Sequence, residues 1–145
     1  MKSLCGMMVG LGAGLLLAGY MAKGADKDKG DEPMKPRVFE MRTYYAAPGK
    51  MDALHKRFKD HTCKLFEKHG MTMIGFWSPT DAKEAEQKMV YILAFPSREA
   101  ADKAWQEFQD DPAWKEAKAA SEKDGKLVDK VDRVFLKATD YSPMK

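Results

Sequence analysis

Arg42 and His61 are the two residues whose types are best suited to chemistry on a small molecule. An unperturbed imidazole titrates at about pH 6.5 and can accept a proton near neutrality, whereas a guanidinium holds an oxyanion through two parallel hydrogen bonds. A cofactor-free oxygenase needs both functions, because deprotonation makes the substrate electron-rich enough to react with oxygen. Trp77 and Tyr91 would form the apolar walls of such a cavity.

Arg42 also has a close acidic neighbour, Glu40, in the strand-like stretch "RVFEMRTYY". Residues two apart in a strand share a face, so the two charges lie on one side of the predicted sheet. A buried charge without a partner is costly, which means that they must pair or reach water. Two interpretations remain open: a structural network involving Asp132 or Arg133, or a cleft in which Arg42 orients an anionic or carbonyl-bearing ligand.

Metal and thiol chemistry find little support in the sequence. The three histidines include no pair at i, i+4 spacing, and neither HExxH nor CxxC occurs. Cys63 is the only cysteine outside the N-terminal segment and is predicted to be a surface thiol. Phosphate-binding glycine loops and serine nucleophile elbows are also absent from the sequence. We therefore expect no metal site and no cofactor.

The N-terminal segment is typical of a secretory signal peptide. Lys2 precedes an uncharged stretch at residues 3–22, and the small residues of "AKG" at residues 22–24 place cleavage near Ala25 and imply export to the periplasm or the extracellular space. The alternative is a retained membrane anchor, since the stretch approaches the length of a span. Without residues 1–24 the 25 basic residues become 23, against 22 acidic ones, so the net charge is +1. We expect no nucleic-acid binding, and no stable membrane association once the signal is removed.

The rest of the chain alternates strand-like and helical patterns. Residues 25–36 are charged and proline-containing, which is typical of a disordered linker before a domain at residues 37–145. Helical spacing after Pro48-Gly49 and again after Ser97 predicts two helical regions, the second restarting at Asp111-Pro112. Strands are predicted at residues 37–45, 71–78, 88–96 and 131–139. The order β-α-β-β-α-β predicts an α+β, ferredoxin-like fold with an antiparallel sheet, whose central strands are the first and third.

Both faces of the predicted sheet are apolar. In the third strand Leu93 and Ile92 point to opposite sides, and each has apolar neighbours on its own face. Two helices cover only one face, so a second copy of the sheet is the simplest cover for the other. The sequence therefore predicts a homodimer.

The stretches "FEMRTYYAAPGKMDAL", "KHGMTMIGFW" and "DDPAW" resemble the NIPSNAP family in its small bacterial form. The resemblance covers about residues 37–143. It implies a ferredoxin-like domain of the dimeric α/β barrel type, and its "RTY" motif falls on Arg42 and Tyr44. It implies little about activity, because the bacterial relatives lack a settled one.

Two functions from different classes follow from these patterns. The first is a non-catalytic ligand-binding or interaction protein, with a small apolar ligand held among the five residues Arg42, Tyr44, His61, Trp77 and Tyr91. Trp105 and Trp114 are further candidates to line an apolar pocket, although aromatic residues at such spacing are usually core. The second is a cofactor-free monooxygenase or isomerase acting on a small aromatic or quinone-like molecule. Convergence of His61 and Arg42 on one cavity would favour the enzyme.

Overall fold

The computed structural model describes residues 37–145. The predicted signal peptide and linker lie outside the described residues. The elements in chain order are β1 (Val38–Ala46), α1 (Met51–Arg57), η1 (Phe58–Thr62), α2 (Cys63–Lys68), β2 (Thr72–Trp77), α3 (Ala82–Ala85), β3 (Lys88–Phe95), α4 (Arg98–Asp110), α5 (Pro112–Ser121) and β4 (Val128–Lys137).

The four strands form one antiparallel sheet in the order β2-β3-β1-β4. β1 and β3 are central, as the sequence predicts, and the α+β, ferredoxin-like fold class is confirmed. In this register Arg42 of β1 lies between Tyr91 of β3 and Arg133 of β4. Side chains from three strands therefore point to the same side of the sheet at the level of Arg42.

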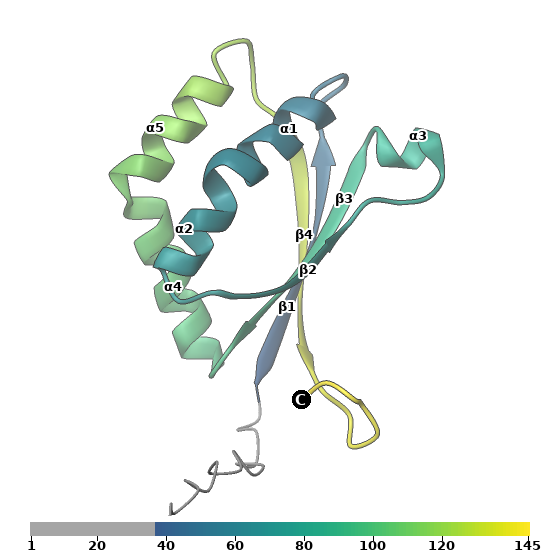
Figure 1. Ribbon diagram of the computed structural model, residues 1–145, viewed down its shortest axis with the longest axis vertical. Coiled ribbons are helices and arrows are strands. Elements are labelled where there is room, and N and C mark those ends of the chain that lie inside the picture. Colours follow the sequence, from purple (N-terminus) through teal and green to yellow (C-terminus); the bar gives the residue numbers. More distant parts are fainter. Residues whose placement is uncertain (1–36) are drawn as a thin grey trace, which may run out of the picture. The chain divides into compact units, whose positions relative to one another are not determined.

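Helices α1, α2, α4 and α5 lie on one side of the sheet, which is seen edge-on in Figure 1. Tyr91 and Leu93 point to that side from β3 and are fully buried. They pack with Leu54 from α1, Phe66 from α2 and Phe108 from α4 in the main apolar cluster. The core thus lies between the helices and the sheet, and the domain has two layers.

The first helical region contains a π-helix, η1, between α1 and α2. A π-turn holds more residues than an α-turn, so a 3.6-residue pattern read through it assigns faces incorrectly. A regular 3.6-residue pattern through this region places His61 at the margin of the apolar stripe, whereas the structure exposes it. Thr62 is the buried residue there, and its hydroxyl donates to the Arg57 carbonyl at 3.3 Å.

Asp111 separates α4 from α5 and begins the second helix. Its Oδ1 accepts a hydrogen bond from the Ala113 amide at 2.8 Å, as an N-cap residue does. Its Oδ2 lies 2.7 Å from Nζ of Lys68 and 2.8 Å from Nε2 of His69, both at the end of the first helical region. One nearly buried carboxylate therefore joins the two helical regions.

A β-bulge in β2 changes which residues of this strand face the helices. The pairing with β3 shifts between Met73 and Gly75, so Phe76 pairs with Tyr91 and stacks on its ring at 5.4 Å. Strict alternation along β2 would put Trp77 on the same face as Met73, but the bulge inserts one residue and reverses this. Trp77 lies on the other face, where a Cβ on Gly75 would come within 2.7 Å of the indole.

The face of the sheet that carries no helix is apolar. Phe39 is buried and Ile92 is half-buried at its centre, whereas Val134 and Leu136 on β4 are about 40% exposed, at 45% and 38%. We call this surface the open face. Within residues 37–145, none of the helices has the length and apolar character needed to cross a bilayer.

Candidate ligand-binding site

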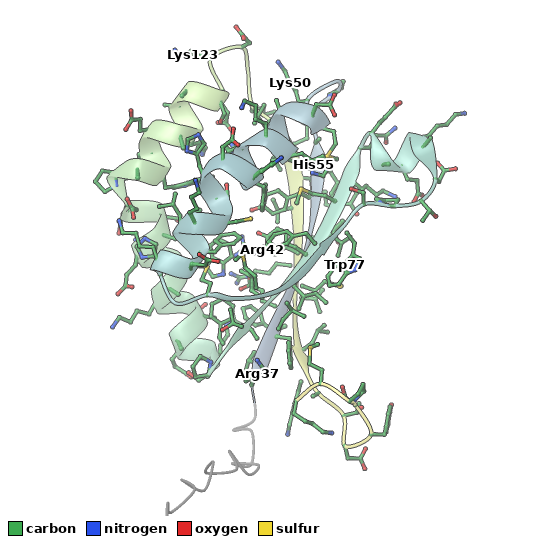
Figure 2. The ribbon with its side chains drawn as sticks, viewed as in Figure 1. Arg37, Arg42, Lys50, His55, Trp77 and Lys123 are labelled. Carbon is green, nitrogen blue, oxygen red and sulfur yellow. The ribbon has the colours of Figure 1, made fainter. Side chains whose placement is uncertain are left out.

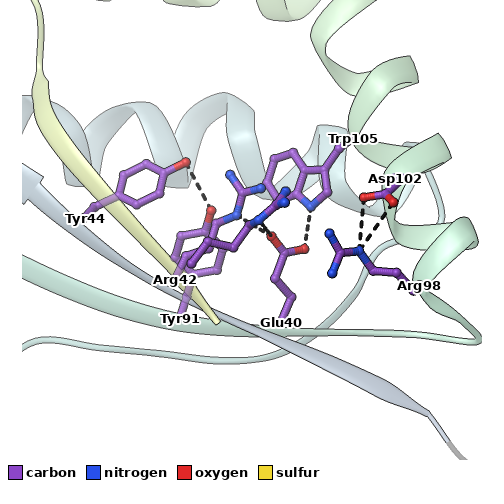
Figure 3. A network of polar contacts seen from close by, with 8 residues as sticks. Glu40, Arg42, Tyr44, Tyr91, Arg98, Asp102 and Trp105 are labelled. Carbon is purple, nitrogen blue, oxygen red and sulfur yellow. Dashed lines mark hydrogen bonds and ion pairs between the residues drawn. The ribbon is translucent and has the colours of Figure 1, made fainter. Parts of the chain in front are cut away.

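Glu40 and Arg42 form a buried ion pair on the helix side of the sheet. Nε of Arg42 donates to Oε1 of Glu40 at 2.7 Å, and the indole Nε1 of Trp105 donates to Oε2 at 2.6 Å. Nε of Arg133 lies 3.8 Å from the same carboxylate. The carboxylate has no exposed surface, and these donors take the place of the water that it loses on folding. Figure 3 shows the carboxylate between Arg42 and Trp105.

The guanidinium of Arg42 is fixed in position by two contacts. Its central carbon lies 3.5 Å from the centroid of the Trp105 ring, a cation–π distance, while Nε is held by Glu40. Among the described residues, no hydrogen bond engages the two terminal nitrogens. Burial by itself lowers the pKa of Arg42, but Tyr91, Tyr44 and Glu40 outweigh this effect and raise it, so the group stays charged.

Tyr44 and Tyr91 lie next to this ion pair. The Tyr91 hydroxyl donates to the Tyr44 hydroxyl at 3.1 Å, and the rings pack edge to face. Burial, followed by the neighbouring Tyr44, raises the pKa of Tyr91 well above 10. Tyr91 is therefore a neutral hydrogen-bond donor at physiological pH and a poor general base.

An open pocket of about 440 Å³ lies over Arg42, and we call it the Arg42 pocket. Arg42 and Tyr44 reach it from β1, and α4 contributes Trp105, Phe108 and Gln109, while α5 contributes Trp114, Lys115 and Lys118. Its volume lies in the range typical of small-molecule sites. In Figure 2, Arg42 lies in the layer between the sheet and the helices.

Trp114 is held at the pocket by packing on two sides. Its ring centroid lies 4.5 Å from that of Phe108, and the guanidinium of Arg57 lies 5.1 Å from it. Arg57 in turn pairs with Glu122 at 2.9 Å, which joins α1 to the end of α5. The aromatic wall of the pocket is therefore built on contacts between the two helical regions.

The five residues predicted from the sequence do not all meet at this pocket. Arg42 and Tyr44 line it, and Tyr91 lies beneath them. Trp77 borders a different pocket, with Phe58 and Phe76, and Figure 2 shows it apart from Arg42. His61 is exposed on η1 and is not among the residues that line the Arg42 pocket.

Cys63 was expected to be a surface thiol, and the structure corrects this expectation. It is half-buried against the core and borders the same pocket as Trp77. Burial raises its pKa, which is the opposite of what an activated thiol needs. In the described part of the chain no group of three or more His, Cys, Asp or Glu side chains is arranged to hold a metal ion.

Two lysines of the pocket were not predicted from the sequence, and Trp105 has a larger role than its sequence pattern indicates. Lys115 and Lys118 are three residues apart in α5, a spacing that puts side chains on one face of a helix. This spacing was visible, but the approach of α5 to β1 was not. The indole of Trp105 belongs to the aromatic core, and its N–H hydrogen-bonds the Glu40 carboxylate across 65 residues of sequence.

The fold and the pocket define an α+β, ferredoxin-like domain with a site between sheet and helices. The model of the NIPSNAP family matches residues 39–143, and the chain belongs to this family. No curated protein matches the chain.

Solved structures of bacterial proteins share the fold. A NIPSNAP family protein with unknown function from Agrobacterium tumefaciens is 20% identical, with a TM-score of 0.65 over 77% of this chain and 96% of its own. A second protein from that bacterium is 16% identical, with a TM-score of 0.65 over 75% and 99%. An uncharacterized NIPSNAP-like domain protein from Burkholderia xenovorans is 17% identical, with a TM-score of 0.63 over 74% and 89%. At these identities the likeness is one of fold.

Proposed function

We propose that the protein is a non-catalytic, small-molecule-binding domain whose site is the Arg42 pocket. The main observation behind this proposal is how the Arg42 side chain is held. Glu40 binds one edge of its guanidinium and Trp105 packs on one face, which leaves the terminal nitrogens for a ligand. A donor that is already in place loses little conformational entropy when it binds, which favours affinity.

The composition of the pocket supports binding rather than proton-transfer catalysis. Its lining residues are aromatic rings, an amide, an arginine and two lysines, and neither a histidine nor a carboxylate, the commonest general bases, is among them. The alternative of a cofactor-free monooxygenase or isomerase requires His61 beside Arg42, and the exposed position of His61 gives that alternative no support.

We further propose that the protein acts as a homodimer outside the cytoplasm. Support for the dimer comes from the open face, where Ile92 of β3 is half-buried and Val134 and Leu136 of β4 are exposed. Apolar surface of this kind is typical of an interface between copies. Support for export comes from the sequence of residues 1–24.

The indole N–H resonances of the three tryptophans give a direct test of binding. Trp105 and Trp114 line the Arg42 pocket, and Trp77 does not. The ¹⁵N-labelled protein is titrated with 1-naphthoate and, separately, with the neutral 1-naphthalenemethanol. Each probe should shift the Trp105 and Trp114 resonances and leave the Trp77 resonance unchanged. If neither probe at millimolar concentration shifts these two resonances, or if Trp77 alone responds, the Arg42 pocket is not a binding site.

A further inference from the structure

The charges that line the Arg42 pocket are all positive. Arg42, Lys115 and Lys118 contribute cations, and in the described residues no carboxylate side chain lines the pocket. The Glu40 carboxylate neutralises Arg42 from beneath, but Lys115 has only a long, exposed contact of 3.9 Å with Asp110. The potential in the pocket therefore favours an anion.

The shape of the donor group favours a carboxylate in particular. The two terminal nitrogens of a guanidinium form a planar fork that matches the two oxygens of a carboxylate. The Arg42 fork is oriented by Nε, through its 2.7 Å bond to Glu40, and by stacking on Trp105. The Tyr44 hydroxyl, which accepts from Tyr91, has its own proton left to donate on the same side.

The walls of the pocket favour a planar, aromatic body. Phe108 and Trp114 pack with their ring planes 37° apart, and Trp105 meets Phe108 edge to face at 5.5 Å. Aromatic faces pack well against flat rings, which bury much area at little entropic cost. A volume of about 440 Å³ accommodates one or two fused rings together with a charged group.

We propose that the physiological ligand is an aromatic carboxylate, with its carboxylate at the terminal nitrogens of Arg42, its ring against Trp114 and Phe108, and Lys115 and Lys118 at the entrance. This inference rests on the proposed binding function and specifies the ligand class for the same pocket. The lysines contribute a long-range attraction that weakens with salt, because they are exposed.

A set of three probes separates the charge of the ligand from its ring. Isothermal titration at low salt should show that 1-naphthoate binds at least about tenfold more tightly than the neutral 1-naphthalenemethanol, and more tightly than the aliphatic anion octanoate. Equal affinity for 1-naphthoate and 1-naphthalenemethanol would overturn the anion assignment but leave the pocket a binding site. Tighter binding of octanoate would overturn the aromatic assignment. If no probe binds, the proposed function itself fails.

Variants of the two lysines test the assignment without disturbing the core. The double variant Lys115→Gln/Lys118→Gln keeps both exposed stems and removes two charges, so we expect the affinity for 1-naphthoate to fall about three- to tenfold. The affinity for 1-naphthalenemethanol should stay the same. Lys83→Gln, on exposed α3, is the matched control and should change neither affinity. An unchanged 1-naphthoate affinity in the double variant would contradict the assigned role of the lysines.

Discussion

Glu40 and Arg42 are two residues apart on the central strand β1, and their side chains form a buried ion pair at 2.7 Å under the helices. The pair is part of a network that also holds Trp105, and Arg42 is at the same time the floor of a pocket. The two interpretations of these charges, structural network and ligand orientation, are therefore compatible. Arg133, on β4, is the neighbour that approaches the pair, whereas Asp132 pairs with Lys130.

The ion pair predicts a large loss of stability when only one partner is neutralised. Arg42→Gln leaves the fully buried Glu40 carboxylate without its main counter-charge, so the free energy of unfolding should fall by about 3 kcal/mol. Urea denaturation measures this loss. The double variant Glu40→Gln/Arg42→Gln should recover part of it, because no buried charge is then unpaired.

The exposed ion pair of Lys56 and Asp60 supplies the control. Its atoms are 2.6 Å apart, yet the Lys56 side chain is 78% exposed, and Lys56→Gln should cost less than about 0.5 kcal/mol. Losses of the same small size for Arg42→Gln and Lys56→Gln would show that the Glu40–Arg42 pair does not stabilise the domain.

Because only one face of the sheet is covered by helices, we expect substitutions at two adjacent positions of β3 to have different effects on folding and on dimer formation. Leu93 is fully buried under the helices, and Leu93→Asp should unfold the protein. Ile92 lies on the open face with Phe39 and Leu136, so Ile92→Asp should keep the circular dichroism of the fold and give monomers in sedimentation. A wild-type protein that sediments as a monomer at micromolar concentration would refute the proposed dimer.

We expect Asp111 to make the free energy of unfolding depend on pH in the acid range. Hydrogen bonds from Lys68, then His69 and the Ala113 amide, lower the pKa of Asp111 in the folded state below the 3.8 of a free carboxyl. Because the pKa of Asp111 is lower in the folded than in the unfolded state, its charged carboxylate stabilises the fold above about pH 4. This stabilisation is lost as the pH falls further, toward the pKa of the folded state.

Asp111→Asn keeps the capping oxygen and removes the charge, so it isolates this contribution. The difference in unfolding free energy between wild type and Asp111→Asn should be positive at pH 6 and shrink below pH 4. The exposed neighbour Asp110 provides the control, since Asp110→Asn should change stability little. If the difference in unfolding free energy between wild type and Asp111→Asn stays constant down to pH 2, the charged Asp111 carboxylate does not stabilise the fold in this way.

The leader sequence predicts the start of the mature protein. Cleavage after the small residues of "AKG" should leave a chain that begins near Ala25. Intact-mass measurement of protein from the native host decides this, and a mass that retains residues 1–22 would favour the membrane anchor instead.

The sequence predicted the sheet order well because the signals for it are local. Alternating apolar runs, the caps at Ser97 and Asp111 and the glycine after His69 define elements, and handedness rules then restrict how they connect. Two features of the structure could not be predicted in this way. The π-helix at residues 58–62 and the bulge beside Gly75 each shift the pattern by about one residue, so a regular period does not give the faces on which His61 and Trp77 lie.

Less of the candidate site was predictable, because it depends on contacts between distant elements. Arg42 was found from its charge beside Glu40 on one strand, and Tyr44 from the resemblance of "RTY" to the family motif. The contribution of Lys118 required knowing that α5 and β1 border the same pocket, and α5 is held there by the packing of Trp114 on Phe108 and Arg57. Packing of this kind leaves no short motif in a sequence.

A crystal structure of the protein with 1-naphthoate tests ligand binding at Arg42 directly. We expect a naphthalene ring against Trp114 and a carboxylate about 3 Å from the terminal nitrogens of Arg42, with the Glu40–Arg42 pair intact. Naphthoate bound instead on the open face, between Phe39 and Leu136, or an empty Arg42 pocket at saturating ligand, would contradict it.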